Sequence, residues 1–446
     1  MYCKLSSFLI LGMKKSGFSS AKLLLSMGAE VFVYDNNPSN ATKDNIDKIV
    51  SLGGINVSDV HAILNDIDVL VLSPGVPIDN EIAIKSRELN KRIIGELELS
   101  SYFITNPLVA ITGTNGKTTT SSMVSHLLNS AGIDNLLVGN IGTPLSSQVE
   151  NFKKDTIGVV EVSSFQLETV QRFLPHIACV LNVTPDHLDR HYNMENYLYL
   201  KSKLLINLRE SEYAVLNYDD ENVRKMAGKT RGNIVWFSCK EKVDGCYFEN
   251  DTFYFDDEEV CTINDVNLSG IHNVENTLAT ISILKILGLN SEEIKNGLTT
   301  FKGVKHRIQE VKTIDGVTFY NDSKSTNPDS CLKAVQSMKG PTVLIMGGYD
   351  KGFDYTNLFK GIKECDKIKK IVLTGSCSNK MFKYALDQEI NEVSVIKEFD
   401  LAINVAKNLA GNGYNVLFSP ATSSFDLFNG FEERGDKFIE IVNSFK

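Results

Sequence analysis

The 446-residue sequence lacks the features that mark membrane, secreted and nucleic-acid-binding proteins. No apolar run approaches the ~20 residues of a membrane helix, and the short run at 8–11 ends at Gly12, which predicts a first strand rather than a signal peptide. None of the eight cysteines forms a Cys-x-x-Cys pair, which favours reduced thiols in a cytoplasm over disulfides or a zinc site. With 46 basic and 55 acidic residues the chain has no basic surplus for nucleic acid, so any anionic ligand must be bound by a local site.

Proline is also scarce, at 10 of 446 residues, which excludes long proline-rich linkers. At ~150 residues per domain the length predicts about three domains, and 42% hydrophobic residues suffice for a core in each. Short β-rich runs alternate with amphipathic stretches, such as 19–27, and the alternation restarts near residues 95 and 303. The pattern predicts parallel sheets with crossover helices in three domains, 1–95, 96–302 and 303–446. Strands are expected at 7–11, 30–34, 68–72, 92–94, 108–112, 157–162, 177–183, 213–216, 233–237, 317–320, 342–346, 370–373 and 415–418.

One segment of the central domain has a different pattern. Residues 245–263 alternate polar with aromatic residues around Asn250-Asp251, a typical turn pair. The segment predicts a hairpin, either added to the central sheet or lying on the surface.

The strongest motif follows an apolar strand and precedes a helix that we expect to end near Ser130; it reads Gly113-Thr114-Asn115-Gly116-Lys117-Thr118-Thr119-Thr120. Small residues let backbone N–H groups approach phosphate oxygens, and the helix N-terminus adds positive potential. Lys117 can neutralise the β- and γ-phosphates, and Thr118 can bind Mg²⁺. Ile111 stands where a general Walker A motif has its first glycine, so the prediction of a phosphate-binding loop depends on the strand-to-helix context. A glycine-rich helix cap is the alternative.

Polar residues also follow the next predicted strands. Glu161 precedes Ser163-Ser164-Phe165-Gln166, and Asp186-His187-Leu188-Asp189-Arg190-His191 comes after the following strand. Because ligands of open α/β sheets gather at the carboxyl ends of strands, these segments should face the phosphate loop, where a carboxylate and an imidazole can hold a cation. Oxygen ligands favour Mg²⁺ over a zinc ion on His187 and His191. A structural polar turn remains an alternative.

The N-terminal run Gly12-Met13-Lys14-Lys15-Ser16-Gly17, with Asp35 after the second strand, is a weak dinucleotide fingerprint. Lys14 occupies the middle glycine position and would obstruct a pyrophosphate, so a nucleotide-sugar or purely structural role is favoured over NAD. Lys15 or Ser16 can still meet a diphosphate at the start of the helix.

The third domain carries charged loops at two strand ends. These are Asn321-Asp322-Ser323-Lys324-Ser325-Thr326-Asn327-Pro328 and Gly347-Gly348-Tyr349-Asp350-Lys351-Gly352. With Lys305-His306-Arg307 they make a positive surface able to close over a phosphate or a carboxylate. Solvated turns are the alternative.

Taken together, these residues resemble the Mur ligase family, the ATP-dependent amide-forming enzymes of peptidoglycan precursor synthesis, over essentially the whole chain. Six motifs follow the family's order: 113–120, 161–166, 186–191, 270–276, 306–307 and 321–328. The resemblance implies a Rossmann-like N-terminal domain, a central P-loop-type ATPase domain and a Rossmann-like C-terminal domain. The strings 73–76, 139–142, 186–191 and 419–426 are most similar to the member that adds D-glutamate to UDP-N-acetylmuramoyl-L-alanine. The sequence departs from the pattern at Lys14, Asn37 and Phe425.

The resemblance implies a two-step reaction. The substrate carboxylate attacks the ATP γ-phosphate to give an acyl phosphate, and the amine of D-glutamate then displaces phosphate. The catalytic residues would be Lys117, His187, Lys201 and Lys324. Two Mg²⁺ ions would be held by Thr118, Glu161, His187 and Lys201, with Lys201 carbamylated by CO₂. From the residues alone, Lys201 is a solvated lysine beside Lys203.

The resemblance also implies three sets of binding residues. ATP would contact the loop from Gly113 to Thr119, with Asn273 and Asn276 at adenine, Asp322 at the ribose and Arg307 at the phosphates or the intermediate. The UDP-sugar would contact Lys15, Ser16, Asp35, Gly75, Asn140, Ser163 and Gln166. D-glutamate would contact Thr326, Lys351, Ser424 and the backbone near Phe431.

Four functional hypotheses stay open on the sequence. The first is the D-glutamate-adding ligase, and the second is another Mur-type or a folylpolyglutamate-type ligase. The others are a nicotinamide oxidoreductase and a non-catalytic nucleotide-binding switch. We expect a cytoplasmic monomer that acts on small molecules, with no nucleic-acid partner and no membrane span.

Overall fold

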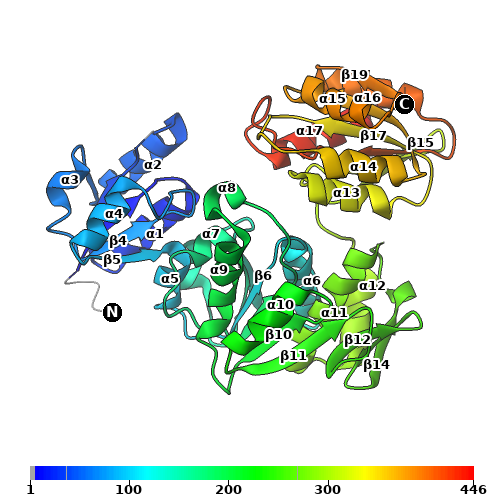
Figure 1. Ribbon diagram of the computed structural model, residues 1–446. Helices are drawn as coiled ribbons and strands as arrows, with labels where there is room; N and C mark the ends of the chain where they lie inside the picture. The colour runs from blue at the N-terminus through cyan, green and yellow to red at the C-terminus, as the bar shows by residue number, and fades with distance from the viewer. Residues whose placement is uncertain (1–5, 37, 269, 446) are drawn as a thin grey trace. The chain divides into compact units, whose positions relative to one another are not determined.

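The structure, a computed structural model, describes residues 6–36, 38–268 and 270–445 (Figure 1). Cys3 and Asn37 lie outside the described residues, so the departure expected at Asn37 has no structural description. The chain divides into two compact units, Met1–Asn267 with Asn273–Phe301, and Leu268–His272 with Lys302–Lys446. The first unit contains a five-stranded and a nine-stranded sheet, and the second a six-stranded sheet. The predicted fold class, three mostly parallel α/β sheets with helices, is confirmed.

The N-terminal sheet is parallel throughout, with strand order β3-β2-β1-β4-β5. Its elements are β1 (Ser7–Leu11), α1 (Lys15–Ser26), β2 (Glu30–Tyr34), α2 (Asn40–Ser51), β3 (Ile55–Asn56), α3 (Val60–Ile63), β4 (Val69–Leu72), α4 (Glu81–Glu88) and β5 (Arg92–Gly95). Apolar residues of α1 and α2 cover one face of the sheet, and those of α3 and α4 cover the other. The strand order reverses between β1 and β4, so their carboxyl ends border the kind of crevice that holds nucleotides.

A short helix, α5 (Glu96–Ser101), joins this sheet to the rest of the first unit. The Glu98 carboxylate is fully buried and accepts hydrogen bonds from the three backbone N–H groups of residues 171–173, at 2.9–3.0 Å. Glu96 Oε1 accepts from the backbone N–H of Ser146 at 2.6 Å, and burial raises the pKa of Glu96. Two acidic side chains of one helix therefore bind backbone donors of the central sheet's loops.

The central sheet has the strand order β14-β13-β12-β11-β10-β9-β6-β8-β7. Its strands are β6 (Leu108–Thr112), β7 (Asn135–Gly139), β8 (Ile157–Glu161), β9 (Ile177–Val180), β10 (Tyr213–Asn217), β11 (Asn233–Ser238), β12 (Gly245–Glu249), β13 (Thr252–Phe255) and β14 (Glu258–Thr262). Its helices are α6 (Lys117–Ser130), α7 (Ser164–Leu167), α8 (Leu188–His191), α9 (Met194–Ile206), α10 (Glu221–Met226), α11 (Ile271–Ile286) and α12 (Ser291–Thr300). One face packs on α7 and α9, while α6 packs on β7 and β8 and contacts α12.

The prediction of a simple hairpin at 245–263 is wrong in one respect. The segment forms three antiparallel strands, because a second turn at Asp256-Asp257, both with positive φ, adds β14 to the expected pair. β12 pairs in parallel with β11, so the segment extends the central sheet rather than lying apart on the surface.

The C-terminal sheet has the order β15-β16-β20-β17-β18-β19 and is parallel except for the β15–β16 pair. Its elements are β15 (Gln309–Ile314), β16 (Val317–Asn321), α13 (Pro328–Ser337), β17 (Thr342–Gly347), α14 (Thr356–Glu364), β18 (Ile368–Thr374), α15 (Ser378–Asp387), β19 (Val393–Val395), α16 (Phe399–Leu409), β20 (Asn415–Phe418) and α17 (Phe431–Ser444). Helices α13, α14 and α15 contribute to one hydrophobic core, and α16 and α17 to the other. The sheet is therefore covered on both faces, as parallel sheets require.

The seven cysteines among the described residues are free thiols. Across residues 6–36, 38–268 and 270–445, no helix combines the length and apolar character that crossing a membrane demands.

Candidate active site

The predicted phosphate loop lies between β6 and α6, at the carboxyl edge of the central sheet. Gly116 has a φ of 87°, which favours glycine, and an added Cβ there would lie 2.3 Å from Asn276 Oδ1. The backbone N–H of Asn115 donates to Asn182 Oδ1 at 2.9 Å, which anchors the loop to the segment after β9. No side chain of the described residues caps α6, so its N-terminus can receive a phosphate group.

Two lysines converge on the carbonyl oxygen of Gly113 in this loop. Lys117 Nζ donates to it at 2.9 Å, and Lys201 Nζ, from α9, donates to it at 2.9 Å as well. Lys201 is 1% exposed, so the alternative of a solvated lysine is wrong. Burial, followed by the charge of Lys117, lowers the pKa of Lys201 well below its usual value. Both effects disfavour the charged form of this amine beside the loop.

Glu161, at the end of β8, has an oxygen available for a cation. Its Oε1 accepts from Asn140 Nδ2 at 2.7 Å, whereas its Oε2 is buried with no hydrogen-bond partner among the described residues. The buried Thr119 hydroxyl also has no partner there. A carboxylate oxygen is costly to bury unpaired, so Glu161, with the buried Thr118 hydroxyl, fits a divalent cation.

The loop after β9 contacts the phosphate loop and carries His187. Thr114 Oγ1 accepts from the backbone N–H of Thr184 at 3.0 Å. His187 has a positive φ of 54°, and its ring lies 4.8 Å from the ring of Phe165 between centroids. A non-glycine residue in this conformation costs about 1–2 kcal/mol, so the surrounding loop must hold it in place.

His191, in α8, has a different environment from His187. It is buried, its Nε2 shares a hydrogen bond with Ser164 Oγ at 2.9 Å, and its Nδ1 lies 3.5 Å from Glu168 Oε1. Burial lowers the pKa of His191 to about 4. Because both ring nitrogens are engaged within the fold, the zinc alternative on His187 and His191 loses its second ligand.

Arg190 links this loop to the N-terminal sheet. It forms two hydrogen bonds to the Glu168 carboxylate, Nε to Oε1 at 3.0 Å and Nη2 to Oε2 at 2.6 Å. Its Nη2 also donates to the backbone carbonyl of Val76, in the loop after β4, at 2.9 Å. Tyr192 donates a further hydrogen bond to Asp79 of the same loop. These two hydrogen bonds thus join the His187 loop to the N-terminal loop, and the largely buried ion pair with Glu168 holds Arg190 in place.

The two asparagines expected at adenine lie at the start of α11. Asn276 Nδ2 donates to Asn273 Oδ1 at 3.2 Å, and Asn276 Oδ1 accepts from Thr120 Oγ1 at 3.2 Å. Both side chains are buried, and Asn276 contacts α6 through Thr120. Their contact with adenine stays a prediction.

The expected UDP-sugar residues come from two sheets: Lys15, Ser16, Asp35 and Gly75 belong to the N-terminal sheet's segments, and Asn140, Ser163 and Gln166 to those of the central sheet. Asp35 Oδ2 accepts from the backbone N–H of Met13 at 2.8 Å, which fixes the loop after β1. Lys15 and Ser16 lie at the start of α1, and Gly75 is in the loop after β4. Ser163 and Gln166 form a reciprocal capping box at the start of α7, and Asn140 contacts Glu161. These arrangements do not test ligand contact, which stays a prediction.

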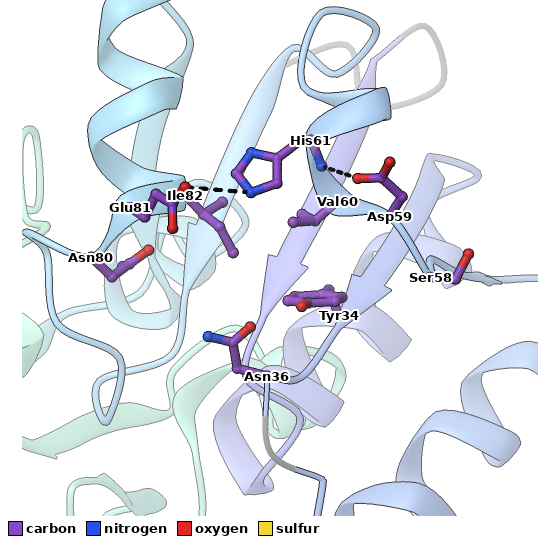
Figure 2. A pocket seen from close by; sticks show the side chains of 9 residues that line it. All are labelled: Tyr34, Asn36, Ser58, Asp59, Val60, His61, Asn80, Glu81 and Ile82. Carbon is purple, nitrogen blue, oxygen red and sulfur yellow. Dashed lines mark hydrogen bonds and ion pairs between the residues drawn. The ribbon is translucent and has the colours of Figure 1, made fainter.

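A pocket of about 230 Å³ lies beside the N-terminal sheet, between the end of β2 and the starts of α3 and α4 (Figure 2). Figure 2 shows the Tyr34 ring and the Asn36 amide at the end of β2, across from Asn80 at the start of α4. Its remaining lining residues are Ser58, Asp59, Val60, His61, Glu81 and Ile82. His61 Nε2 lies 3.8 Å from Glu81 Oε1 at the rim. An aromatic ring with amide groups is a lining suited to a planar polar ring.

In the second unit, Asp322 follows β16 and is almost fully buried. Its Oδ2 accepts from Ser419 Oγ at 2.7 Å, and its Oδ1 accepts from the backbone N–H of Ile308 at 3.2 Å. Burial raises the pKa of Asp322 to about 6, against the opposing charge of Arg307. The buried Arg307 Nε has no hydrogen-bond partner among the described residues, so this guanidinium retains a donor for a ligand.

The residues expected at D-glutamate belong to four segments of the second unit. Thr326 is in the loop after β16, Lys351 in the loop after β17, Ser424 in the loop after β20, and Phe431 at the start of α17. Lys351 is exposed and lies over the ring of Phe353, 4.8 Å from its centroid. Ser424 is buried, and Lys324 lies over the ring of Phe431 at 5.2 Å. We call Thr326, Lys351, Ser424 and Phe431 the amino-acid platform.

Comparison with known families defines the class of protein. The family model described as "Mur ligase MurD-like, N-terminal domain" matches residues 6–95, "Mur ligase middle domain" matches 111–284, and "Mur ligase, glutamate ligase domain" matches 306–422. The chain belongs to the Mur ligase family, the ATP-dependent amide-forming enzymes of peptidoglycan precursor synthesis, and the prediction of a ligase is confirmed. Family membership argues against the nicotinamide oxidoreductase and the non-catalytic switch.

Curated relatives cover the full length of the chain. One from Clostridioides difficile (strain 630) is 39% identical and one from Thermoanaerobacter sp. (strain X514) is 40% identical, covering 98% and 99% of both chains respectively. Both are named "UDP-N-acetylmuramoylalanine--D-glutamate ligase".

Solved structures support the fold alone. MurF from Acinetobacter baumannii matches with a TM-score of 0.64 at 18% identity, covering 97% of this chain and 93% of that one. UDP-N-acetylmuramate-alanine ligase MurC from Thermotoga maritima matches with a TM-score of 0.62 at 20% identity, covering 99% and 100%.

Sequence reasoning missed three polar groups around these sites. They are the Glu168–Arg190 pair, the buried Arg434 of α17 and the Glu98 carboxylate. Arg190 stands inside a motif that the sequence did single out, but its partner Glu168 lies 22 positions away. The sequence around Glu98 and around Arg434 shows only a charged residue in a short amphipathic stretch, so it does not indicate that either side chain is buried.

Proposed function

We propose that this protein joins D-glutamate to UDP-N-acetylmuramoyl-L-alanine with hydrolysis of ATP to ADP and phosphate. The proposal rests on one observation above the others: Lys117, Lys201 and the unpartnered Glu161 oxygen surround a phosphate loop in a chain whose full-length relatives carry that name. In this proposal residues 1–95 bind the UDP-sugar, 96–302 bind ATP and 303–446 bind the amino acid.

The first step is a phosphoryl transfer. The L-alanine carboxylate of the nucleotide substrate attacks the γ-phosphorus of ATP, and the bond from that phosphorus to the β-phosphate oxygen breaks. ADP departs, and the substrate carboxylate is now an acyl phosphate. Negative charge develops on the transferring oxygens, so Lys117 and the N–H groups of the loop stabilise it. Two Mg²⁺ ions would be held by Thr118, Glu161, His187 and Lys201 and would supply further charge neutralisation.

The state of Lys201 follows from its burial. Lys201 and Lys117 donate to the same carbonyl oxygen, so burial and the charge of Lys117 both disfavour the protonated form of Lys201. An uncharged amine is the form that adds CO₂, and the resulting carbamate would give an anionic oxygen ligand for a hard metal ion. We therefore keep the proposal that Lys201 is carbamylated in the active enzyme.

The second step forms the amide. The amine of D-glutamate attacks the acyl carbon, a tetrahedral intermediate forms, and phosphate leaves. In the proposal Lys324 and Arg307 contact the phosphates or the intermediate. Asp322 contacts the ribose of ATP, and Asn273 and Asn276 contact its adenine. The amino-acid platform binds D-glutamate through the Lys351 charge and hydroxyl or backbone donors.

The nucleotide substrate would bind through its diphosphate and its base. Lys15, Ser16 and Gly75 would receive the diphosphate, with Asp35 fixing the loop that carries it. Asn140, Ser163 and Gln166 would contact the sugar and its L-alanine. The pocket beside Tyr34 and Asn36 has the size and lining for the uracil ring (Figure 2). We further propose a cytoplasmic monomer, because ATP is a cytoplasmic substrate and the proposed chemistry requires no second chain.

One assay tests the proposal. Phosphate release from ATP is measured with UDP-N-acetylmuramoyl-L-alanine and a panel of D- and L-amino acids, and the nucleotide product is weighed by mass spectrometry. We expect release that depends on D-glutamate. Release with another amino acid would favour another Mur-type ligase, and release with a folate substrate would favour a folylpolyglutamate-type ligase. Release without any amino acid dependence would refute both amide-forming proposals.

A further inference from the structure

Arg434 in α17 is a buried arginine at the meeting point of two loops of the second unit. It is 2% exposed. Its Nε and Nη2 donate to the hydroxyl and the carbonyl oxygen of Ser323, at 3.1 and 2.9 Å. Its Nη1 donates to Ser423 O at 2.9 Å, and its Nη2 also donates to Thr422 O at 3.1 Å. One guanidinium thus binds the loop after β16 and the loop after β20.

The same acceptors extend the network to the other two segments of the amino-acid platform. Ser323 Oγ, which accepts from Arg434, donates to the backbone carbonyl of Phe431 at 2.8 Å. Ser423 O, which also accepts from Arg434, accepts from the backbone N–H of Tyr349 at 2.9 Å. Arg434 therefore connects, directly or through one atom, all four segments that carry the platform residues.

The charge of Arg434 has no acidic partner. Among the described residues no carboxylate lies within ion-pair distance of its guanidinium, and its hydrogen-bond acceptors are neutral. Burial lowers the pKa of Arg434 to about 10, against the opposing charges of Asp426 and Asp322, so the side chain stays protonated at neutral pH. A buried cation with no carboxylate in direct contact adds positive potential around it, which Asp426 and Asp322 offset only in part, and so favours an anionic ligand.

We propose that Arg434 is a positioning and specificity residue of the amino-acid platform. Its planar fork sets the relative position of the four segments, and its charge favours an amino acid whose side chain is a carboxylate over the isosteric amide. The inference rests on the proposed function, because it takes the platform as the D-glutamate site. Arg434 itself acts through the loops that it holds rather than by touching the substrate.

Three variants separate the effect of the guanidinium's several hydrogen bonds, which we call the fork, from the effect of its charge. Arg434→Lys keeps the charge and loses the fork, Arg434→Gln loses the charge, and Ser323→Ala removes only the hydroxyl that links Arg434 to Phe431. Rates are measured with D-glutamate and D-glutamine as amino acids, and KM is measured for D-glutamate and for ATP. The matched control is Lys312→Gln, which removes a cation whose Nζ donates to the backbone carbonyl of Phe445 at 3.2 Å, beyond α17's other end.

We expect Arg434→Gln to raise the KM for D-glutamate by about 10-fold or more and to lower the D-glutamate to D-glutamine preference in kcat/KM by a similar factor. Arg434→Lys should raise the KM for both amino acids while keeping most of the preference. Ser323→Ala, which leaves no large cavity, should raise the KM for D-glutamate about threefold. The KM for ATP should stay within about twofold in all of them, as in the control.

Two results would overturn the inference. One is an unchanged preference and KM for D-glutamate in folded Arg434→Gln, or in Ser323→Ala should both Arg434 variants fail to fold. The other is an equal rise of the KM for ATP and for D-glutamate, which would indicate general loosening of the unit. Failure of the wild-type protein to use D-glutamate would instead refute the proposed function.

Discussion

The Arg190–Glu168 pair gives the sharpest test of how the first unit positions the loop that carries His187. The side chains are 17% and 6% exposed and share two short hydrogen bonds. Glu168→Gln keeps the shape but removes the charge, and its amide N–H₂ then faces a guanidinium donor. Breaking a fully buried pair costs about 3–5 kcal/mol, and the partial exposure of Arg190 reduces this to about 2–3 kcal/mol.

Loss of the pair should also lower the catalytic rate. Arg190 also holds the Val76 carbonyl, and His187 lies three residues before it in the same loop. Without the pair the loop loses its fixed relation to the N-terminal sheet, so we expect kcat to fall about 10- to 100-fold. Arg190→Met should produce a comparable fall.

The assay uses the only tryptophan of the chain, Trp236 in β11, whose fluorescence reports unfolding of the central sheet in urea. A double-mutant cycle of Glu168→Gln and Arg190→Met should give a coupling energy of at least ~1.5 kcal/mol. The control is Glu221→Gln, which breaks the exposed pair with Lys225 and should leave the urea midpoint unchanged. Additive effects in the cycle, or a wild-type kcat in Glu168→Gln, would refute the reasoning.

The remaining predictions concern single residues. Lys117→Ala should lower phosphate release by ~10³ with an unchanged circular dichroism spectrum, and near-normal turnover would contradict the phosphate-loop assignment. Lys201→Ala should be nearly inactive and partly restored by formate or acetate, whereas full activity, or an unmodified amine in the mass spectrum of the active enzyme, would remove the carbamate. Lys351→Met should raise the KM for D-glutamate by ~10-fold with little change for ATP, and equal changes would place recognition elsewhere. Gly348→Ala should lower the melting temperature and raise the KM for D-glutamate, because its Cβ would lie 2.3 Å from Ser423 O at a φ of 146°; wild-type values for both would show that the loop can adjust.

The interior strands could be predicted from the sequence because parallel strands buried on both faces are nearly continuous apolar runs. The predicted strands are confirmed with small shifts at their ends. The strands that the sequence did not reveal, β3, β7, β14, β15 and β19, all lie at sheet edges. Edge strands are only partly buried, so their sequences carry weaker apolar patterns, as in the polar run of β15.

The candidate site also has features that the local sequence predicts and features that depend on contacts distant in the sequence. The phosphate loop was predictable because its glycines, lysine and threonines act within one local strand-to-helix turn. The burial of Lys201 was not, because it depends on α9 packing 88 positions away from Gly113. Arg434 and Ser323 are 111 positions apart, so their contact exists only in the tertiary structure. Local motifs therefore predict the chemistry, whereas the residues that hold the loops in place became apparent only from the fold.

The buried Glu98 carboxylate has a consequence for amide hydrogen exchange. The N–H groups of residues 171–173 lie outside any strand or α-helix, yet all three are held by this one side chain from α5. Their exchange with deuterium should therefore be slow, and it should become faster at all three amides together when α5 detaches from this loop. Three adjacent amides of a loop thus report on the attachment between the N-terminal and central sheets.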